Sequence, residues 1–427
     1  MSNSSAVAFN ELLASPPQPT MGTEAVDRIL HAIRDHLGMD VAFVAEFRKS
    51  DRVFRHVDAR DATPIQPGDA APLEMGYCQR VVDGRLPELI PDTQRVPAAK
   101  ALAETHSIPI GAHVSVPIRL SDGRLFGTFC CFSFSPDPSL SDRDLQVMKA
   151  FAALLGHQLD RDIEGQRDRS DKVKRIESAL TQGQPSIVYQ PIFDLRTRRL
   201  AGLESLSRFQ MEPQRSPDRW YAEAVEAGLS AELEIAAIRS ALPALSAMPP
   251  DTYLSVNCSP NTAQSGLLDQ VLHATDIRRV VLEITEHDFI EDYPALLAAL
   301  APLRALGLRV AIDDAGAGYA SLRHVLHIQP ELIKLDISLT RNIDADPKRR
   351  ALASALIAFA RETQARLIAE GVETAAELRT LRNLGATCAQ GYFLSRPLPL
   401  FDALAQPFPA PARETDEEAL LDARSAR

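Results

Sequence analysis

The sequence contains few cysteines and no long apolar segment. The longest apolar run, around residues 295–303, is far below the roughly 20 residues that a membrane-spanning helix requires. The first twenty residues lack the basic start and apolar block of a secretory signal. The cysteines are scattered and odd in number, so they indicate neither a disulfide framework nor a zinc site. They are Cys78, Cys130, Cys131, Cys258 and Cys388. We therefore expect a soluble cytoplasmic protein with no membrane partner.

Basic residues are in the minority. Lys and Arg total 46 against 57 for Asp and Glu, which gives a formal net charge of -11. Such a chain repels a polyphosphate backbone, so we expect no nucleic-acid polymer as a partner. An acidic protein that handles phosphate would need metal ions to offset the repulsion.

The length of 427 residues predicts two or three domains at about 150 residues each. Hydrophobic residues make up 45% of the chain and charged residues 24%. This balance is typical of a globular protein with a large core, and it excludes general disorder and fibrous architectures.

An α+β domain is predicted for residues 20–160, after a disordered stretch at 1–19. Apolar residues at helical spacing predict a helix over 21–38, and a strand follows at 40–47. The runs 114–120 and 125–134, joined by a turn that contains Asp122 and Gly123, predict a β-hairpin. Ser141 with Asp144 three residues later is the pattern of a capping box that opens a closing helix.

A charged segment follows this domain. Apolar residues are sparse over 156–176, with Leu159 and Ile163 four residues apart. The pattern predicts an exposed helical linker, which we assign to residues 161–177. It could pair with its copy in a dimer or remain a solvated linker, and the sequence favours neither.

Beyond Ser178, short apolar runs alternate with helical segments, and each run ends abruptly in a polar residue. The alternation predicts a (β/α)8 barrel over residues 178–406, followed by a disordered tail at 407–427. Any one polar strand end could serve turn chemistry alone, but all strands of such a barrel end at one mouth. The polar strand ends of seven runs supply Glu204, Asn257, Glu283, Asp313, Asp314, Lys334, Asp336, Glu370 and Gln390.

Carboxylates crowded at one mouth repel one another unless cations offset them. The carboxylates of this set are Glu204, Glu283, Asp313, Asp314 and Glu370. Because the set offers oxygen ligands and no His or Cys, it favours Mg²⁺ or Mn²⁺ over zinc or copper. The adjacent Asp313 and Asp314 suit a pair of metal ions roughly 3.5 to 4 Å apart, the arrangement used for phosphoester hydrolysis.

Several ordered motifs over residues 176–399 resemble the EAL-domain cyclic di-GMP phosphodiesterases. They are Gln190-Pro191-Ile192, Glu204-Ser205-Leu206, Asn257-Cys258-Ser259-Pro260, Glu283-Ile284-Thr285-Glu286, Asp313-Asp314, Lys334-Leu335-Asp336, Glu370-Gly371-Val372-Glu373 and Gln390-Gly391-Tyr392. The resemblance implies a modified TIM-like barrel with one antiparallel strand. It also implies attack of water on a phosphodiester of cyclic di-GMP, which opens the ring to linear pGpG.

The resemblance also implies roles for individual residues. A first metal ion would be bound by Glu204, Asn257, Glu283 and Asp313. A second would be bound by Asp313, Asp314 and, through water, Glu370. Lys334 would orient the attacking water, and Glu370 is also the candidate general base. Arg208 would pair with a substrate phosphate. Gln190, Asp336, Glu373 and Gln390 would position the substrate, and Glu286 would anchor the loop beside the metals.

Two departures from the family pattern affect the expected activity. Ser205 stands where the family has Ala, and its similar size predicts little loss. Ala315 and Ala317 replace a Phe and a Thr in the loop after the paired aspartates. This loop borders the metals and the dimer contact in the family, so the exchange leaves the level of activity open.

Residues 20–160 resemble GAF sensory domains in element order and in the run from Gly76 to Val82. No cyclic-nucleotide signature is present, so the expected small-molecule ligand is unknown. We interpret Cys78, Cys130 and Cys131 as small core residues in preference to chromophore or redox thiols.

The leading hypothesis is a cytoplasmic, Mg²⁺- or Mn²⁺-dependent cyclic di-GMP phosphodiesterase with two metal ions per site. The GAF domain would adjust its activity, and the resemblance implies a homodimer. The alternative is a catalytically weak cyclic di-GMP receptor. The intact carboxylate set favours the enzyme, because a receptor has no need of a full two-metal site. A purely structural dimerisation protein would leave that set unexplained.

Overall fold

The computed structural model describes residues 22–285, 290–316 and 319–409. The chain divides into two compact units, Met1–Asp168 and Arg169–Arg427. Each unit has its own hydrophobic core.

Unit 1 is built on a six-stranded antiparallel sheet with the order β3-β2-β1-β6-β5-β4. The predicted first helix is α2 (Gly22–Leu37), and the predicted hairpin is confirmed as β5 and β6. The strands are β1 (Val41–Arg48), β2 (Asp51–Ala59), β3 (Ala70–Pro72), β4 (Leu89–Ile90), β5 (Ala112–Arg119) and β6 (Leu125–Ser133). Short helices between them are α3 (Tyr77–Val82), α4 (Pro97–Lys100) and α5 (Ala103–Ser107).

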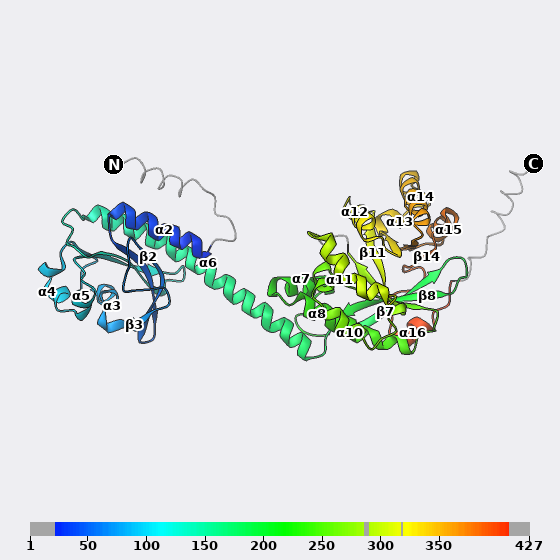
Figure 1. Cartoon of the computed structure of the whole chain (residues 1–427), viewed down its shortest axis with the longest axis horizontal. Coiled ribbons are helices and arrows are strands. Elements are labelled where there is room, and N and C mark those ends of the chain that lie inside the picture. The colour runs from blue at the N-terminus through cyan, green and yellow to red at the C-terminus, as the bar shows by residue number, and fades with distance from the viewer. Residues whose placement is uncertain (1–21, 286–289, 317–318, 410–427) are drawn as a thin grey trace, which may run out of the picture. The chain divides into compact units, whose positions relative to one another are not determined.

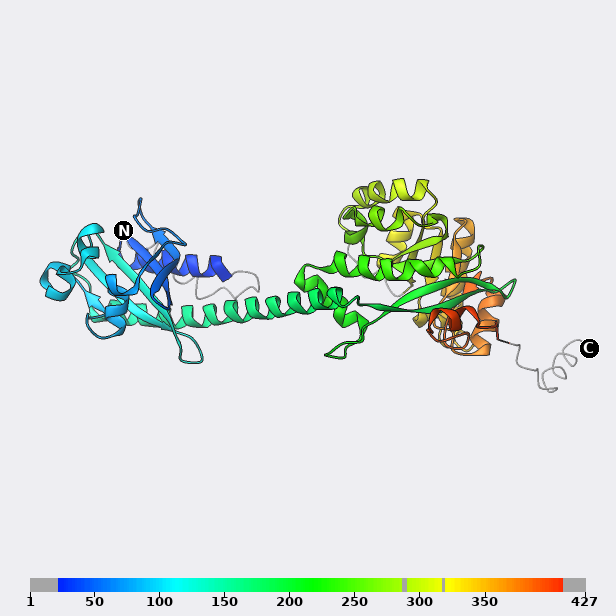
Figure 2. The same cartoon turned by 90° about the horizontal axis from the view of Figure 1, so that it is seen from below.

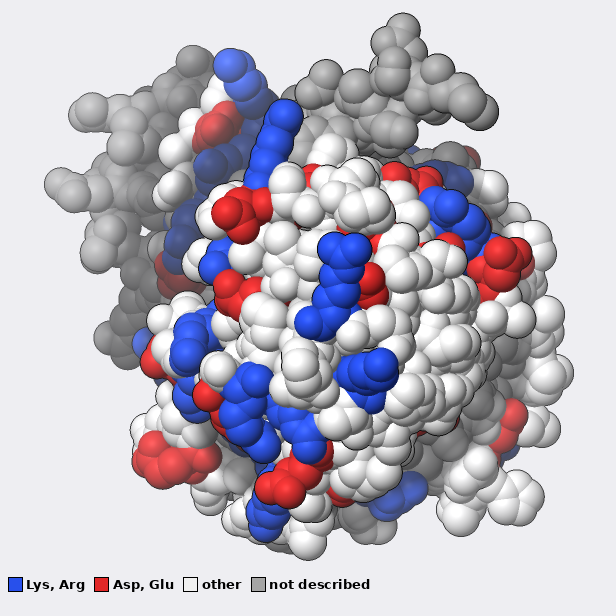
Figure 3. Space-filling model, turned by 90° about the vertical axis from the view of Figure 1, so that its left-hand side faces the viewer, with Lys and Arg blue, Asp and Glu red and all other residues white. Residues whose placement is uncertain are grey.

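The two faces of this sheet carry separate cores, because side chains alternate along each strand. Ala42 and Val44 of β1 pack with α2 and the first part of α6 (Asp142–Thr181), whereas Val41 and Phe43 pack in the other core with α3. Figure 1 and Figure 2 show α2 and the start of α6 together along the sheet. The side of the molecule in Figure 3 carries basic and acidic side chains interspersed, with no extended patch of one sign.

Helix α6 is one uninterrupted element that includes the predicted linker. Ser141 opens it, since its hydroxyl and its backbone N–H both lie 2.8 Å from Oδ2 of Asp144. Leu159 is buried in the core of unit 1, whereas Ile176 is buried in unit 2. Residues 164–171 are exposed. The segment contains no proline, so nothing in its sequence interrupts the helical hydrogen bonds.

Unit 2 contains a closed eight-stranded barrel, which confirms the predicted fold. Seven strands match the predicted runs, and β7, the eighth, is antiparallel to both its neighbours β8 and β14. The strands are β7 (Ser186–Asp194), β8 (Leu200–Arg208), β9 (Tyr253–Asn257), β10 (Val280–Ile284), β11 (Arg309–Ala315), β12 (Leu332–Leu335), β13 (Arg366–Ala369) and β14 (Cys388–Ala389). The main helices are α7 (Pro217–Ala227), α8 (Ser230–Ala241), α9 (Pro260–Gln264), α10 (Leu267–Leu272), α11 (Tyr293–Ala305), α12 (Tyr319–Ile328), α13 (Ile337–Thr340), α14 (Pro347–Glu362), α15 (Ala375–Leu384) and α16 (Leu400–Leu404).

The barrel interior is layered. A buried apolar cluster inside it includes Val281, Ala311, Leu332, Ile368 and Cys388. Two residues further along each of these chain segments stand Glu283, Asp313, Lys334, Glu370 and Gln390. Because residues two apart on a strand share a face, the apolar layer supports a polar layer directly above it.

A candidate metal centre at the barrel mouth

One ammonium group lies at the centre of the polar layer. Lys334 of β12 is only 1% exposed. Its Nζ lies 2.8 Å from Glu370 Oε1, 2.9 Å from Glu283 Oε2, 3.1 Å from Asp313 Oδ1 and 3.2 Å from Glu204 Oε1. These carboxylates come from four segments that are far apart in the sequence. The barrel thus brings five of the predicted site residues together, with four carboxylates around the ammonium of Lys334.

Burial and charge shift the protonation of this cluster. Burial raises the pKa of Glu283 to about 8, although the nearby Lys334 opposes the shift. Burial likewise raises the pKa of Glu370 well above its ordinary value. Burial acts to lower the pKa of Lys334, but the surrounding carboxylates outweigh it and hold that pKa well above its usual range. The ammonium therefore stays charged, and the cluster has more negative groups than one lysine can neutralise.

The carboxylates form two groups that share one member. Oxygen atoms of Glu204, Glu283 and Asp313 lie within 4.8 Å of one another, and so do those of Asp313, Asp314 and Glu370. Asp314 has a positive φ of 54°, which costs a non-glycine residue about 1–3 kcal/mol. A regular strand would send consecutive side chains to opposite faces. The turn at Asp314 lets both aspartates serve the same mouth.

Two glutamines hold one of these carboxylates in place. Nε2 of Gln390 donates to Oε2 of Glu204 and, at 3.0 Å, to Oε1 of Gln190. Nε2 of Gln190 in turn donates to the carbonyl oxygen of Ser395 at 2.9 Å. All three side chains are buried. Gln190 and Gln390 thus lie with the cluster, and their hydrogen bonds fix the orientation of Glu204.

Sequence reasoning missed Ser255. Its hydroxyl donates to Oε1 of Glu283 at 2.6 Å from the neighbouring strand β9. The available signal was its position two residues before Asn257, which places both side chains on the barrel-facing side of β9. Ser205, the residue that departs from the family motif, donates its hydroxyl to the carbonyl oxygen of Ser255 at 2.8 Å.

The other predicted residues that the structure describes contact groups outside this cluster. Asn257 ends β9 in register with Glu283. Arg208 ends β8 and donates to the carbonyl oxygen of Ser207 at 2.7 Å. Asp336 caps α13 by accepting the N–H of Ser338 at 2.9 Å. Glu373 forms an ion pair with Arg341. Glu286 and Ala317 lie outside the described residues, whereas Ala315 is a buried residue of β11.

The donor set fits hard divalent cations. It consists of carboxylates, with one amide oxygen available from Asn257, and such oxygen ligands suit Mg²⁺ or Mn²⁺. The five carboxylates and the ammonium of Lys334 leave four formal negative charges, which two divalent ions would offset. Asp313 is the carboxylate that both groups share.

A sequence model of the EAL domain matches residues 173–397, which is more than half of the chain. The chain belongs to the EAL-domain family. A second model, of the GAF domain, matches residues 23–160. The EAL barrel is therefore unit 2, and the GAF domain forms the α+β fold of unit 1.

Relatives of the EAL barrel include named phosphodiesterases. The cyclic di-GMP phosphodiesterase NbdA of Pseudomonas aeruginosa is 32% identical over 239 residues, which cover 53% of this chain and 30% of that protein. The cyclic di-GMP phosphodiesterase PA2567 of the same organism is 31% identical over 224 residues, which cover 50% and 38% of the two chains. The matches thus span roughly a third of the length of these two relatives.

Solved structures share the fold. The PaMucR phosphodiesterase in complex with c-di-GMP has 28% identity and a TM-score of 0.50, covering 54% of this chain and 99% of that one. The EAL enzyme Bd1971 with cAMP and cyclic di-GMP bound has 21% identity and a TM-score of 0.51, covering 86% and 92%. The latter similarity supports the fold alone.

Proposed function

We propose that this EAL-domain protein hydrolyses cyclic di-GMP to linear pGpG with two Mg²⁺ or Mn²⁺ ions bound at the barrel mouth. The observation that carries the proposal is the arrangement of the carboxylates in two sets of three, which share Asp313 and lie at Lys334. A cyclic di-GMP receptor would need donors for phosphate and guanine, but it would not need five carboxylates at the mouth. EAL relatives named as cyclic di-GMP phosphodiesterases support the same substrate.

The metal ligands would be divided between the two groups. Glu204, Asn257, Glu283 and Asp313 would bind the first ion, and Asp313, Asp314 and Glu370 the second, with Glu370 acting through water. When bound, the ions would supply a water of lowered pKa and would neutralise charge that develops on the phosphate.

The chain's own residues would orient the reactants. Lys334 would hold the attacking water and a phosphate oxygen, since its Nζ already lies among the carboxylates at 2.8–3.2 Å. Glu370 would accept the proton of that water. Arg208, on the strand that carries Glu204, would pair with a substrate phosphate.

Residues at the rim would position the rest of the substrate. Gln390 and Gln190 would do so while they hold Glu204 in its orientation. Asp336 and Glu373 would act at the loops that follow β12 and β13. Glu286 would anchor the loop beside the metals.

Regulation would run through α6. This helix starts in the core of the GAF domain and ends against α7, where Arg175 lies 3.1 Å from buried Glu223. We propose that a small-molecule ligand of the GAF domain shifts this contact, and that two copies of the chain form a homodimer. We also propose a cytoplasmic location for the protein. Within the described ranges, every helix is either too short or too polar to cross a bilayer.

The test uses purified full-length protein, freed of metal with a chelator and then supplied with Mn²⁺ or Mg²⁺ and cyclic di-GMP. Chromatography should show pGpG only after metal is restored, at many turnovers per protein. Stoichiometric binding of cyclic di-GMP without turnover in both metals would establish the receptor in place of the enzyme. In the same assay Glu283→Gln should abolish turnover, because it removes a charged oxygen ligand. The matched control Glu362→Gln, which changes an exposed glutamate of α14, should retain turnover.

A further inference from the structure

Two cysteine thiols meet inside unit 1, away from the barrel. Cys78 of α3 and Cys130 of β6 are wholly buried, and their Sγ atoms lie 3.7 Å apart. They are 52 residues apart in the sequence, so no spacing pattern pairs them. A disulfide has an S–S distance of about 2.05 Å. The two sulfurs therefore need only a small shift, within one core cluster, to bond.

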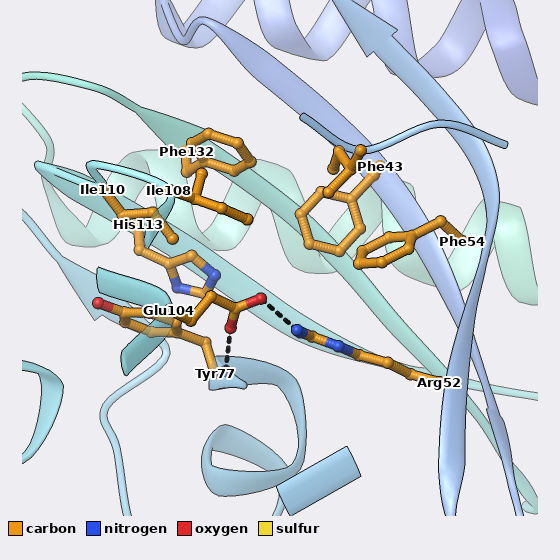
Figure 4. A pocket seen from close by; sticks show the side chains of 10 residues that line it. Phe43, Arg52, Phe54, Tyr77, Glu104, Ile108, Ile110, His113 and Phe132 are labelled. Carbon is orange, nitrogen blue, oxygen red and sulfur yellow. Dashed lines mark hydrogen bonds and ion pairs between the residues drawn. The ribbon is translucent and has the colours of Figure 1, made fainter. Parts of the chain in front are cut away.

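A guanidinium group is held against one of the two sulfurs. Nη1 of Arg52 donates to Sγ of Cys78 at 3.1 Å, and Nη2 forms an ion pair with Glu104. Glu104 also accepts the backbone N–H of Tyr77 at 3.2 Å (Figure 4). Gly76 makes room for this arrangement, because a Cβ there would lie 2.3 Å from Nη1 of Arg52. Arg52 is only 3% exposed, so its charge acts on Cys78 without solvent screening.

The surroundings make the two sulfurs chemically different. The hydrogen bond from Cys130, opposed by burial and reinforced by Arg52, lowers the pKa of Cys78 to about 6. Burial raises the pKa of Cys130 well above its ordinary value. Ser115 lies 3.1 Å and Thr128 3.3 Å from the Cys130 sulfur. Such an asymmetric pair, one nucleophilic thiolate beside one protonated thiol, is the arrangement that disulfide formation uses.

A small cavity lies beside Arg52, the residue that donates to Cys78, but neither cysteine lines it. It has a volume of about 10 Å³ and is lined by Arg52, Tyr77, Glu104 and His113 together with apolar side chains (Figure 4). That volume admits about one water-sized molecule. Nε of Arg52 and Nδ1 of His113 are buried and have no hydrogen-bond partner among the residues that the structure describes. Burial and, to a lesser degree, Arg52 lower the pKa of His113 to about 3, so its ring is neutral.

We propose that Cys78 and Cys130 form a dithiol site that reacts with hydrogen peroxide. The Cys78 thiolate attacks one peroxide oxygen, so an S–O bond forms and the O–O bond breaks. The departing hydroxide takes up a proton from solvent, which balances the proton that the Cys78 thiol lost when it ionised. The sulfur of Cys130 then attacks the sulfenic acid of Cys78. An S–S bond forms, the S–O bond breaks, and water leaves with the Cys130 proton. In sum, two thiols and one peroxide yield a disulfide and two waters.

The chain supplies its own control. Cys131 is the next residue along β6, but it faces the opposite core and contacts Sδ of Met148 at 3.8 Å. Burial raises the pKa of its thiol above the ordinary range. Cys131 is as deeply buried as Cys130, yet it has no place in the proposed reaction.

The experiment exposes reduced full-length protein to hydrogen peroxide near neutral pH, then alkylates the remaining thiols under denaturing conditions. Mass spectrometry should show the loss of two hydrogens and a linked Cys78–Cys130 peptide pair. The Cys131→Ser variant should give the same pair. The Cys130→Ser variant, treated with dimedone under the same denaturing conditions, should give a trapped sulfenic acid at Cys78. Cumene hydroperoxide, which is much bulkier than hydrogen peroxide, should form the pair at least about tenfold more slowly, because both thiols are wholly buried.

Peptide mapping of the wild type needs no substitution, so a variant that fails to fold does not affect the central result. Thermal melts of the Cys130→Ser and Cys131→Ser variants show whether each comparison is made on folded protein. The proposal is overturned if folded wild-type protein retains all five alkylatable thiols in excess peroxide. It is also overturned if peroxide oxidises Cys131 as fast as Cys78, or if the disulfide joins any other pair.

Discussion

Replacing Lys334 by Met tests whether one buried ammonium holds the metal-free barrel mouth together. The substitution keeps much of the side-chain volume and removes the positive charge that contacts Glu204, Glu283, Asp313 and Glu370 together. Removing one partner of a buried ion pair costs about 3–5 kcal/mol. We expect the lower end, about 3 kcal/mol, because carboxylates whose pKa is already raised can protonate.

A loss of that size should appear clearly in a thermal melt without metal. At about 2–4 °C per kcal/mol for a domain of this size, the barrel transition should fall by about 6–12 °C. Mn²⁺ should restore most of the difference, since divalent ions offset the same carboxylates. Turnover of cyclic di-GMP at saturating Mn²⁺ should still fall by about two decades, because the group that orients water and phosphate is gone.

Lys348→Met is the matched control, since Lys348 is an exposed residue of the first turn of α14. Its melting temperature and turnover should stay near those of the parent. A metal-free Lys334→Met protein that melts within about 2 °C of the parent would refute the electrostatic account of the cluster. Full turnover at saturating metal would refute the proposed role of Lys334 in orienting the reactants.

Three further predictions concern other parts of the chain. Glu204→Ala should lower pGpG formation by two to three decades, about 3–4 kcal/mol, whereas Glu362→Ala should leave it unchanged. The pKa of His113 is about 3 in the folded protein against an ordinary 6.5. As the pH falls below about 6.5, only the unfolded state binds a proton at this ring, so the free energy of unfolding decreases by up to about 1.4 kcal/mol per pH unit. In urea unfolding between pH 7 and 5, His113→Gln should therefore weaken the acid dependence and His106→Gln should not. Deleting residues 1–170 should leave metal binding intact but change the basal rate of hydrolysis by about 5- to 150-fold. If the isolated barrel matches the full-length protein in rate, both with and without a GAF ligand, the GAF domain does not regulate the barrel.

The barrel mouth could be predicted from the sequence because parallel strands impose a simple rule. Each short apolar run ends in a polar residue, and the parallel strands of one barrel end at one mouth. Glu204, Glu283, Asp313, Lys334 and Glu370 were located in this way, and the structure brings them into contact. The rule says nothing of β7, because an antiparallel strand brings its opposite end to the mouth. Its Gln190 was found only through the family motif.

The contacts that orient the site could not be predicted, because they depend on the register between strands. The sequence places Lys334 at a strand end, but its four carboxylate contacts require the alignment of β12 with β8, β10, β11 and β13. Ser255 reaches Glu283 only because β9 pairs with β10 in the observed register. A register shift of one residue would turn each of these side chains to the other face of its strand.

The extent of α6 shows a different limit of sequence reasoning. The charged segment 161–177 lacks the apolar stripe of a packed helix, so it was predicted to be a separate linker. A helix continues as long as nothing interrupts its hydrogen bonds, however, and the segment contains no proline. Its apolar ends, near Leu159 and Ile176, pack in the cores of two different units.

The paired thiols follow from the same alternation that organises the barrel, acting on a different sheet. Cys130 and Cys131 are neighbours in sequence with the same burial, yet the strand sends one toward α3 and Arg52 and the other toward Met148. The sequence alone predicts that both cysteines are ordinary core residues. The two thiols differ only in the face of the sheet on which they lie. Cys130 lies beside Cys78, which Arg52 contacts, whereas Cys131 lies among apolar groups. The chemistry proposed for Cys130 therefore depends on the alternation of side chains along β6. A shift of β6 by one residue against its neighbours would exchange the positions of Cys130 and Cys131.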